Sequence, residues 1–181
     1  EPIEAVKNGV QTLLTTLKQD PYALETAYVS VITFDSSARQ AVPLTDLLSF
    51  QMPALTASGT TSLGEALTLT ASSIAKEVQK TTADTKGDWR PLVFLMTDGS
   101  PNDDWRKGLN DFKAARTGVV VACAAGHDAD TSVLKEITEI VVQLDTADSS
   151  TIKAFFKWVS ASISVGSQKV ESSKKEVIGL E

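Results

Sequence analysis

The chain has 181 residues, of which 42% are hydrophobic, and this length and composition are those of one ordinary globular domain with a single core. Its formal net charge is −6 at pH 7, which excludes nucleic acid and anionic membranes as electrostatic partners because both repel a net-negative surface. The single cysteine allows no disulfide within the chain, and no stretch approaches the roughly 18 to 20 apolar residues of a membrane span.

The first fifty residues predict one long helix and two strands. Apolar residues recur at three- and four-residue spacing from Pro2 to Leu17, a pattern typical of one buried helical stripe. Residues 27–34 are rich in β-branched and aromatic types and predict a strand. A short edge strand over residues 40–42 follows, and we expect it to turn at Pro43.

A second long helix is predicted over residues 63–78, with Thr61 or Ser62 placed to cap its first turn. Further on, Leu92 to Met96 form a continuous apolar run, which is typical of a strand covered on both faces of a parallel sheet. We therefore expect that strand to be central or nearly so.

The remaining pattern alternates between helix and strand. In chain order it predicts a helix over 103–115, a strand over 118–124, a short helix over 132–137, a strand over 140–144 and an amphipathic helix over 152–163. Such alternation implies βαβ crossovers, so the predicted fold is α/β, with a doubly wound, mostly parallel sheet flanked by helices. We expect the domain to span residues 1–165 and residues 166–181 to form a C-terminal tail or extension.

Two predicted loops lie at the carboxyl edge of this sheet, over residues 58–67 and 95–103. A small hydroxyl and a carboxylate converging there suit a hard divalent cation such as Mg²⁺, which prefers oxygen ligands. Simpler readings exist, because Thr97-Asp98-Gly99 is common turn chemistry and Thr61 also serves as a helix cap.

Together with the strand before them, these loops resemble the metal-ion-dependent adhesion site of the von Willebrand factor A family, over about residues 1–165. The resemblance implies that Thr61, six residues before Leu67, and Asp98 bind Mg²⁺, or else Mn²⁺ or Ca²⁺. It also implies an open coordination position that an acidic residue of a protein partner fills. We therefore expect a metal-dependent protein-binding module and not an enzyme. Further residues near this edge are candidates for outer-shell or partner contacts: Asp35, Ser36, Thr60, Ser62, Gly99 and Trp105.

The chain departs from this family in one respect, because it contains no Asp-x-Ser-x-Ser run. The nearest imitation, Asp128 to Ser132, lacks the first serine and follows the wrong strand. Metal binding by this chain alone is therefore expected to be weak or absent. We expect an upstream segment of the natural protein to carry the family's first strand and that motif; alternatively, residues 177–180 or a second chain fill its place.

The phrase from Phe94 to Trp105, followed by Lys107-Gly108-Leu109, is similar to the bacterial TerY-like branch associated with tellurium resistance. This narrower resemblance implies a cytoplasmic role in tellurium resistance or stress response. It also implies kinase-like or phosphatase-like partners, or other tellurium-resistance proteins.

Two rival functions remain open. A Mg²⁺-dependent hydrolase or phosphotransfer domain could use Asp98, although Ser58 to Thr61 lacks the lysine of a phosphate-binding loop. A metal-free scaffold is the other rival. His127 has no evident partner, and Cys123 lies in an apolar run, so a Cys/His nucleophile pair is not expected.

Overall fold

The computed structural model describes residues 2–55, 59–80, 82–84, 87–88, 90–97, 100–125 and 130–144, together with four single residues between 154 and 161. The predicted helix over 152–163, apart from those single residues, and the predicted tail over 166–181 lie outside the described residues. In the described part of the chain, no helix is long and apolar enough to cross a membrane.

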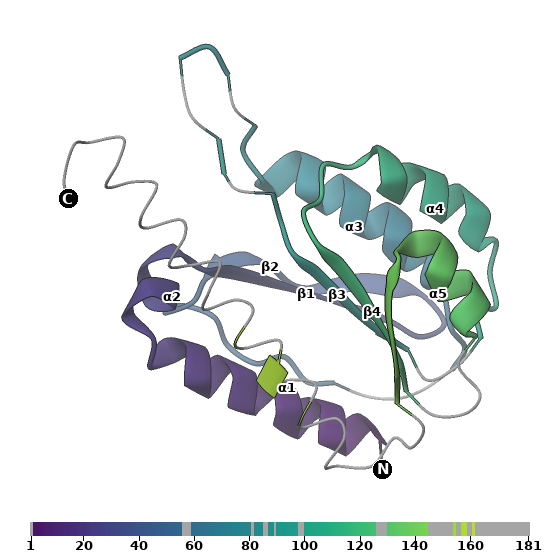
Figure 1. Ribbon diagram of the computed structural model, residues 1–181, viewed down its shortest axis with the longest axis horizontal. Coiled ribbons are helices and arrows are strands. Elements are labelled where there is room, and N and C mark those ends of the chain that lie inside the picture. Colours follow the sequence, from purple (N-terminus) through teal and green to yellow (C-terminus); the bar gives the residue numbers. More distant parts are fainter. Residues whose placement is uncertain are drawn as a thin grey trace. The chain divides into compact units, whose positions relative to one another are not determined.

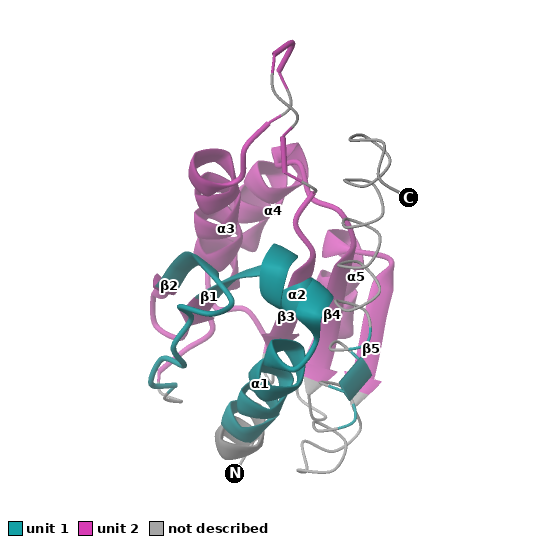
Figure 2. Ribbon diagram, turned by 90° about the vertical axis from the view of Figure 1, so that its left-hand side faces the viewer, with its two compact units in different colours: residues 1–31, 42–56, 148–181 teal, residues 32–41, 57–147 magenta. Residues whose placement is uncertain are grey.

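The chain divides into two compact units, coloured separately in Figure 2. Unit 1 comprises residues 1–31, 42–56 and 148–181, and unit 2 comprises residues 32–41 and 57–147. Each unit has its own cluster of buried apolar side chains. The loops singled out from the sequence belong to unit 2.

Unit 1 is built on helix α1, Pro2–Lys18, which confirms the predicted amphipathic helix. Leu14 and Leu17 are buried in its core together with Ala23, Leu47 and Phe50. A short helix, α2 (Pro21–Thr26), was not predicted. Its signal is nevertheless in the sequence, because Asp20 caps the first turn through the backbone N–H of Tyr22 and proline follows at the first helical position.

Strands β1, Tyr28–Phe34, and β2, Ala38–Asp46, pair across a three-residue connection as a hairpin. The prediction for β1 is confirmed. The prediction that the next strand covers only residues 40–42 and turns at Pro43 is wrong, because β2 continues through Pro43. Among the described residues β2 has β1 as its only strand neighbour, and edge strands are where proline is tolerated within sheets.

Unit 2 contains a parallel sheet of strands β3, Val93–Thr97, β4, Val120–Ala125, and β5, Ile140–Leu144, in the order β3-β4-β5. All three strands and their parallel pairing were predicted. The strand at residues 92–96 was predicted to be central or nearly so; among the described residues β4 is the central strand and β3 lies beside it, at one end of the sheet. A continuous apolar run reports burial of both faces, which does not determine the number of strand neighbours.

Three helices cover one face of this sheet: α3, Leu63–Glu77, α4, Trp105–Ala114, and α5, Thr131–Ile137 (Figure 1). Their buried leucines pack with Ala122 and Ala124, which alternate with Val121 and Cys123 on the opposite face of β4. The fold is therefore α/β with a parallel sheet flanked by helices, as predicted.

Candidate functional site

Three short loops of unit 2 meet at the candidate site. Residues 35–37 connect β1 to β2, residues 59–62 lead into α3, and residues 100–104 lead into α4. The middle loop is hydrogen-bonded to the loops on both sides of it. This arrangement brings together residues that are far apart in the sequence.

The first loop holds the middle loop through two hydrogen bonds. The backbone N–H of Ser62 donates to the carbonyl oxygen of Asp35 at 2.9 Å, and the backbone N–H of Thr60 donates to Ser36 Oγ at 3.4 Å. Gly59 has a φ of 75°, in the left-handed region that favours glycine, and a side chain there would overlap Ser36 Oγ. The close approach of the two loops therefore requires glycine at this position.

The third loop holds the middle loop from the other side through Asn102. The backbone N–H of Thr61 donates to Asn102 Oδ1 at 2.7 Å, and the backbone N–H of Asn102 donates to the carbonyl oxygen of Thr61 at 2.9 Å. We call this reciprocal pair the Thr61–Asn102 clasp. It uses both main-chain polar groups of Thr61.

Asp103 caps helix α3 from the same loop. Its Oδ1 accepts from the backbone N–H of Gly64 and its Oδ2 from that of Glu65, each at 2.9 Å. Ser62, one of the two predicted caps, occupies the N-cap position, but its side chain makes no capping hydrogen bond. The expectation that Asp103 begins the following helix is also wrong, because α4 starts at Trp105 and Asp104 is its N-cap.

The structure brings together most of the residues that the sequence singled out at this edge. Thr61 is half-buried, and its hydroxyl has no hydrogen-bond partner among the described residues. Asp35, Ser36 and Thr60 lie on the same loops, and Ser62 is 6% exposed. Asp98 and Gly99 lie outside the described residues, so the predicted ligand pair stays a prediction.

Trp105 has a partly structural role that the sequence did not indicate. Its side chain packs against the unit 2 core, and the Arg106 guanidinium lies 4.7 Å from its ring centroid. It is half-buried, so only part of its surface is available to a partner. The roles of Asn102 and Asp103 were not predicted from the sequence, although a run of Asx residues directly before a helix is their signal.

The oxygen atoms at this edge are of the types that bind a hard cation. Hydroxyl and carboxyl oxygens of Thr61, Ser36 and Asp35 are the ligand types that Mg²⁺ and Ca²⁺ prefer. In the part of the chain that the structure describes, no three Asp, Glu, His or Cys side chains cluster so that they could hold a metal ion.

Cys123 does not supply a nucleophile for the rival enzymatic function. The side chain is fully buried in β4, and burial raises the pKa of its thiol to about 11. A thiol with such a pKa stays protonated at neutral pH, and the protonated form is a poor nucleophile. His127, the other residue considered for that role, lies outside the described residues.

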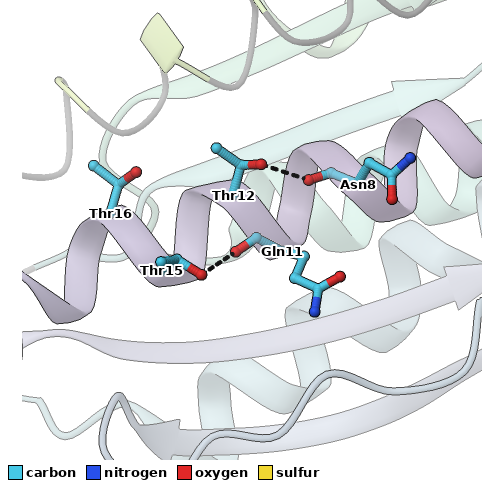
Figure 3. A pocket seen from close by; sticks show the side chains of 5 residues that line it. All are labelled: Asn8, Gln11, Thr12, Thr15 and Thr16. Atoms are coloured by element: carbon cyan, nitrogen blue, oxygen red, sulfur yellow. Dashed lines mark hydrogen bonds between the residues drawn. The ribbon is translucent and has the colours of Figure 1, made fainter.

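A shallow hollow on unit 1 offers no competing chemistry (Figure 3). It lies along α1 and is lined by exposed uncharged side chains: Asn8, Gln11, Thr12, Thr15 and Thr16. The hydroxyls of Thr12 and Thr15 donate to the carbonyl oxygens of Asn8 and Gln11, one turn earlier. These contacts are those of the polar face of an amphipathic helix.

Comparison with known proteins identifies a family for this arrangement. The sequence profile of the von Willebrand factor type A domain matches residues 1–157. No curated protein matches the chain.

Several solved structures share the fold at low sequence identity. A von Willebrand factor type A protein from Catenulispora acidiphila is 19% identical, with a TM-score of 0.67, and the match covers 90% of this chain and 38% of that one. Proximal thread matrix protein 1 from the mussel byssus, solved with a zinc-occupied MIDAS motif, is 21% identical with a TM-score of 0.60, covering 88% of this chain and 42% of that one. BatB from Bacteroides thetaiotaomicron is 20% identical with a TM-score of 0.55, covering 88% and 87% of the two chains. This chain thus spans less than half the length of the first two relatives.

Proposed function

The chain belongs to the von Willebrand factor type A family, and from that membership we propose that it is a protein-binding module whose partner docks on the three loops of unit 2. Domains of this family typically bind protein ligands through a metal-ion-dependent adhesion site. We propose binding without catalysis, because no three Asp, Glu, His or Cys side chains cluster in the described part of the site and the buried Cys123 thiol, whose pKa is raised to about 11, is not an activated nucleophile.

The observation that carries this proposal is the Thr61–Asn102 clasp. It commits both main-chain groups of Thr61, while the hydroxyl has no hydrogen-bond partner among the described residues. A side-chain oxygen held in place on a fixed loop is what a metal ligand requires.

In this proposal Thr61 and Asp98 hold the metal, which is Mg²⁺ or, in its place, Mn²⁺ or Ca²⁺. The ion supplies a positive charge with an open position, and an Asp or Glu of the partner occupies it. Two ligands from this chain leave most of an octahedral shell to water and to other groups, so the intrinsic affinity for metal is low.

The biological setting that we propose is bacterial tellurium resistance or a related stress response in the cytoplasm. The support for it is the similarity of the phrase from Phe94 to Trp105 to the TerY-like branch. Kinase-like or phosphatase-like proteins of such a system are the proposed partners. A partner with basic surroundings would suit the net charge of −6.

Calorimetric titration with Mg²⁺ and Mn²⁺ tests the metal site. We expect the unmodified chain to bind Mn²⁺ weakly and the Thr61→Ala and Asp98→Ala variants to lose that binding. Thr15→Ala and Asp84→Ala are matched controls, since both alter exposed side chains elsewhere on the chain. Equal binding by all variants, or hydrolysis of a generic phosphoester by the metal-loaded chain, would overturn the proposal.

The proposed setting has a separate test. In a tellurite-resistant bacterium that carries this protein, exchanging its gene for the Asp98→Ala form should lower the tolerated tellurite concentration, whereas Asp84→Ala should not. Unchanged tolerance with Asp98→Ala would refute the tellurium-resistance role and leave the binding role standing.

A further inference from the structure

We propose that the exposed face of α4 is a docking surface for an acidic segment of a protein partner, with Arg106, stacked on Trp105, as its main contact. We call this surface, formed by Arg106, Asn110 and Lys113, the α4 basic face. The proposal goes beyond the proposed function, because the contact needs no metal ion and lies on a helix outside the three loops. Trp105 was a candidate for partner contact from the sequence, whereas Arg106 was not.

The α4 segment is basic in a chain that is acidic overall. Residues 105–116 contain four bases and one acid, whereas the whole chain has a net charge of −6. The acid, Asp111, accepts a hydrogen bond from Lys107 at 3.0 Å, so these two charges balance each other. The other three bases are exposed and give the segment its net positive charge: Arg106, Lys113 and Arg116.

Helix stability does not explain the position of two of these bases. The first turn of α4 has no acidic residue and contains Arg106 and Lys107, although the positive end of the helix dipole disfavours cations there. The N-cap Asp104 uses its carboxylate to accept from the backbone N–H of Arg106. Lys113, in the last turn, is by contrast placed where a cation favours the helix. Residues that go against such a local preference are expected where their side chains serve recognition.

The guanidinium of Arg106 is oriented by its neighbours while its hydrogen-bonding capacity is left for a partner. It lies 4.7 Å from the ring centroid of Trp105, which packs against the unit 2 core and so gives it a fixed platform. Its Nη1 is 3.9 Å from Glu136 Oε2, too far for a hydrogen bond, and its side chain is 73% exposed. A guanidinium binds a carboxylate through two parallel N–H bonds, and Trp and Arg are enriched among the residues that dominate protein interfaces.

Charge and spacing indicate the kind of segment that fits this surface. Arg106, Asn110 and Lys113 follow one side of α4 at four- and three-residue spacing, so the two bases are about 10 Å apart along the helix axis. Three residues of an extended chain span about the same length, so Asp or Glu side chains three positions apart reach both bases. The rest of the chain is acidic overall, so a longer polyanion such as nucleic acid would be repelled beyond α4.

Single replacements separate this surface from general attraction between charges. We expect Arg106→Ala to weaken the binding of an octaglutamate peptide by about 10-fold and Lys113→Ala by about threefold. Arg106→Lys keeps the charge but loses the planar group that stacks on Trp105, so it should also weaken binding by about threefold or more. Arg39→Ala, which removes an exposed arginine on β2, is the matched control. All of these replaced side chains are exposed, so the variants should fold.

The experiment is fluorescence anisotropy of dye-labelled octaglutamate with the full chain and the four variants, in EDTA at physiological salt, with thermal melting of each. The proposal predicts that the wild type binds in EDTA and that Arg106→Ala loses most of this binding. Absence of binding by the wild type, equal losses in Arg106→Ala and Arg39→Ala, or unchanged binding by Arg106→Lys would overturn it. Tighter binding of a labelled oligodeoxythymidylate of equal charge would overturn the assignment to an acidic protein segment. Since EDTA removes divalent ions, each of these outcomes is independent of the Mn²⁺ titration that tests the proposed function.

Discussion

At the scale of single residues, Asn102 and Asp103 of the 100–104 loop accept hydrogen bonds from residues at and before the start of α3, although the helix that follows them in the sequence is α4. Asp103 accepts from two backbone N–H groups at the start of α3, which have no partner within the helix. A carboxylate at that place also interacts favourably with the helix dipole. The first turn of α3, which begins two residues after Thr61, thus depends on a residue about forty positions later in the sequence.

Replacing Asp103 should therefore destabilise the protein more than replacing an ordinary surface aspartate. We expect Asp103→Ala to cost about 1 to 2 kcal/mol, the upper range for loss of a helix cap, because two hydrogen bonds are lost together. Urea unfolding followed by circular dichroism measures this, with Asp84→Ala as the control for an exposed carboxylate. A shift in midpoint no larger than that of the control would show that the cap contributes nothing.

The buried Cys123 thiol predicts an alkaline dependence of stability. Its pKa is raised from 9.0 to about 11 in the folded state by burial. Between these values the unfolded chain loses the proton while the folded chain retains it, so stability falls as pH rises through this window. Cys123→Ala removes this contribution.

The free energy of unfolding of the wild type and of Cys123→Ala, measured at neutral pH and again between about pH 9 and 11, checks this prediction. Comparing the two proteins cancels the titration of tyrosines and lysines, which both contain. We expect the wild type to lose more stability than the variant on going to alkaline pH. Parallel losses in both proteins would contradict a buried, protonated thiol.

At the scale of elements, helices α3 and α4 approach so closely that glycine is needed on both. A Cβ on Gly108 would overlap the main chain of Gly64, and a Cβ on Gly64 would come within 2.7 Å of the Asp104 carbonyl oxygen. Replacing a glycine inside a helix by alanine normally stabilises the helix by about 1 kcal/mol. Here the contact between the two main chains should make the same replacement destabilising.

We therefore expect Gly108→Ala to lower the stability of the protein by about 1 to 3 kcal/mol, the cost of overpacking. Thermal or urea unfolding gives the value. Ala114→Gly, in the last turn of the same helix, is a useful comparison because it tests helix propensity at an exposed position. A stabilised Gly108→Ala variant would show that the helices separate easily.

Amide hydrogen exchange along strand β3 tests which strands lie beside it. The register with β4 directs the N–H groups of Val93 and Leu95 toward β4, and those of Phe94 and Met96 away from it. Since β3 lies at the end of its sheet among the described residues, amide hydrogen exchange should alternate along the strand, with Phe94 and Met96 exchanging faster. Equal protection of all four amides would indicate a further strand on that edge.

At the scale of the whole molecule, the sequence predicted the fold class and nearly every element of the described part. Helical stripes and the apolar strands at residues 92–96 and 118–124 are strong signals, because periodicity follows directly from which faces are buried. The position of β3 at the end of its sheet, among the described residues, was not predictable in this way, since the number of strand neighbours depends on tertiary pairing. The continuation of β2 through Pro43 was not predicted either, because it also depends on how the strands pair.

For the candidate site, the sequence indicated which loops to consider but not the contacts between them. Small polar residues at the predicted carboxyl ends of strands singled out this edge, and the structure brings Thr60, Thr61 and Ser36 together there. The Thr61–Asn102 clasp and the Asp103 cap join residues about forty positions apart, and no local pattern specifies such pairs. Which Asx side chain serves which loop depends on the packing of α3 against α4.

The net charge of the chain affects how any metal titration must be interpreted. A charge of −6 attracts divalent cations to the surface in general, without a site. Raising the salt from about 0.01 M to about 1 M shortens the Debye length from about 30 Å to about 3 Å and removes this attraction. Ligands in direct contact with an ion are screened much less.

We therefore expect the apparent Mn²⁺ affinity of the wild type to fall with salt, while the ratio of its affinity to that of Asp98→Ala stays roughly constant. Titrations of both proteins at low and high NaCl give this ratio, and Asp84→Ala should follow the wild type throughout. A ratio that falls to one at high salt would mean that Mn²⁺ only collects around an acidic surface. A ratio that persists would mean that Asp98 contributes to a site in which the ion is held at short range, as protein recognition through a metal requires.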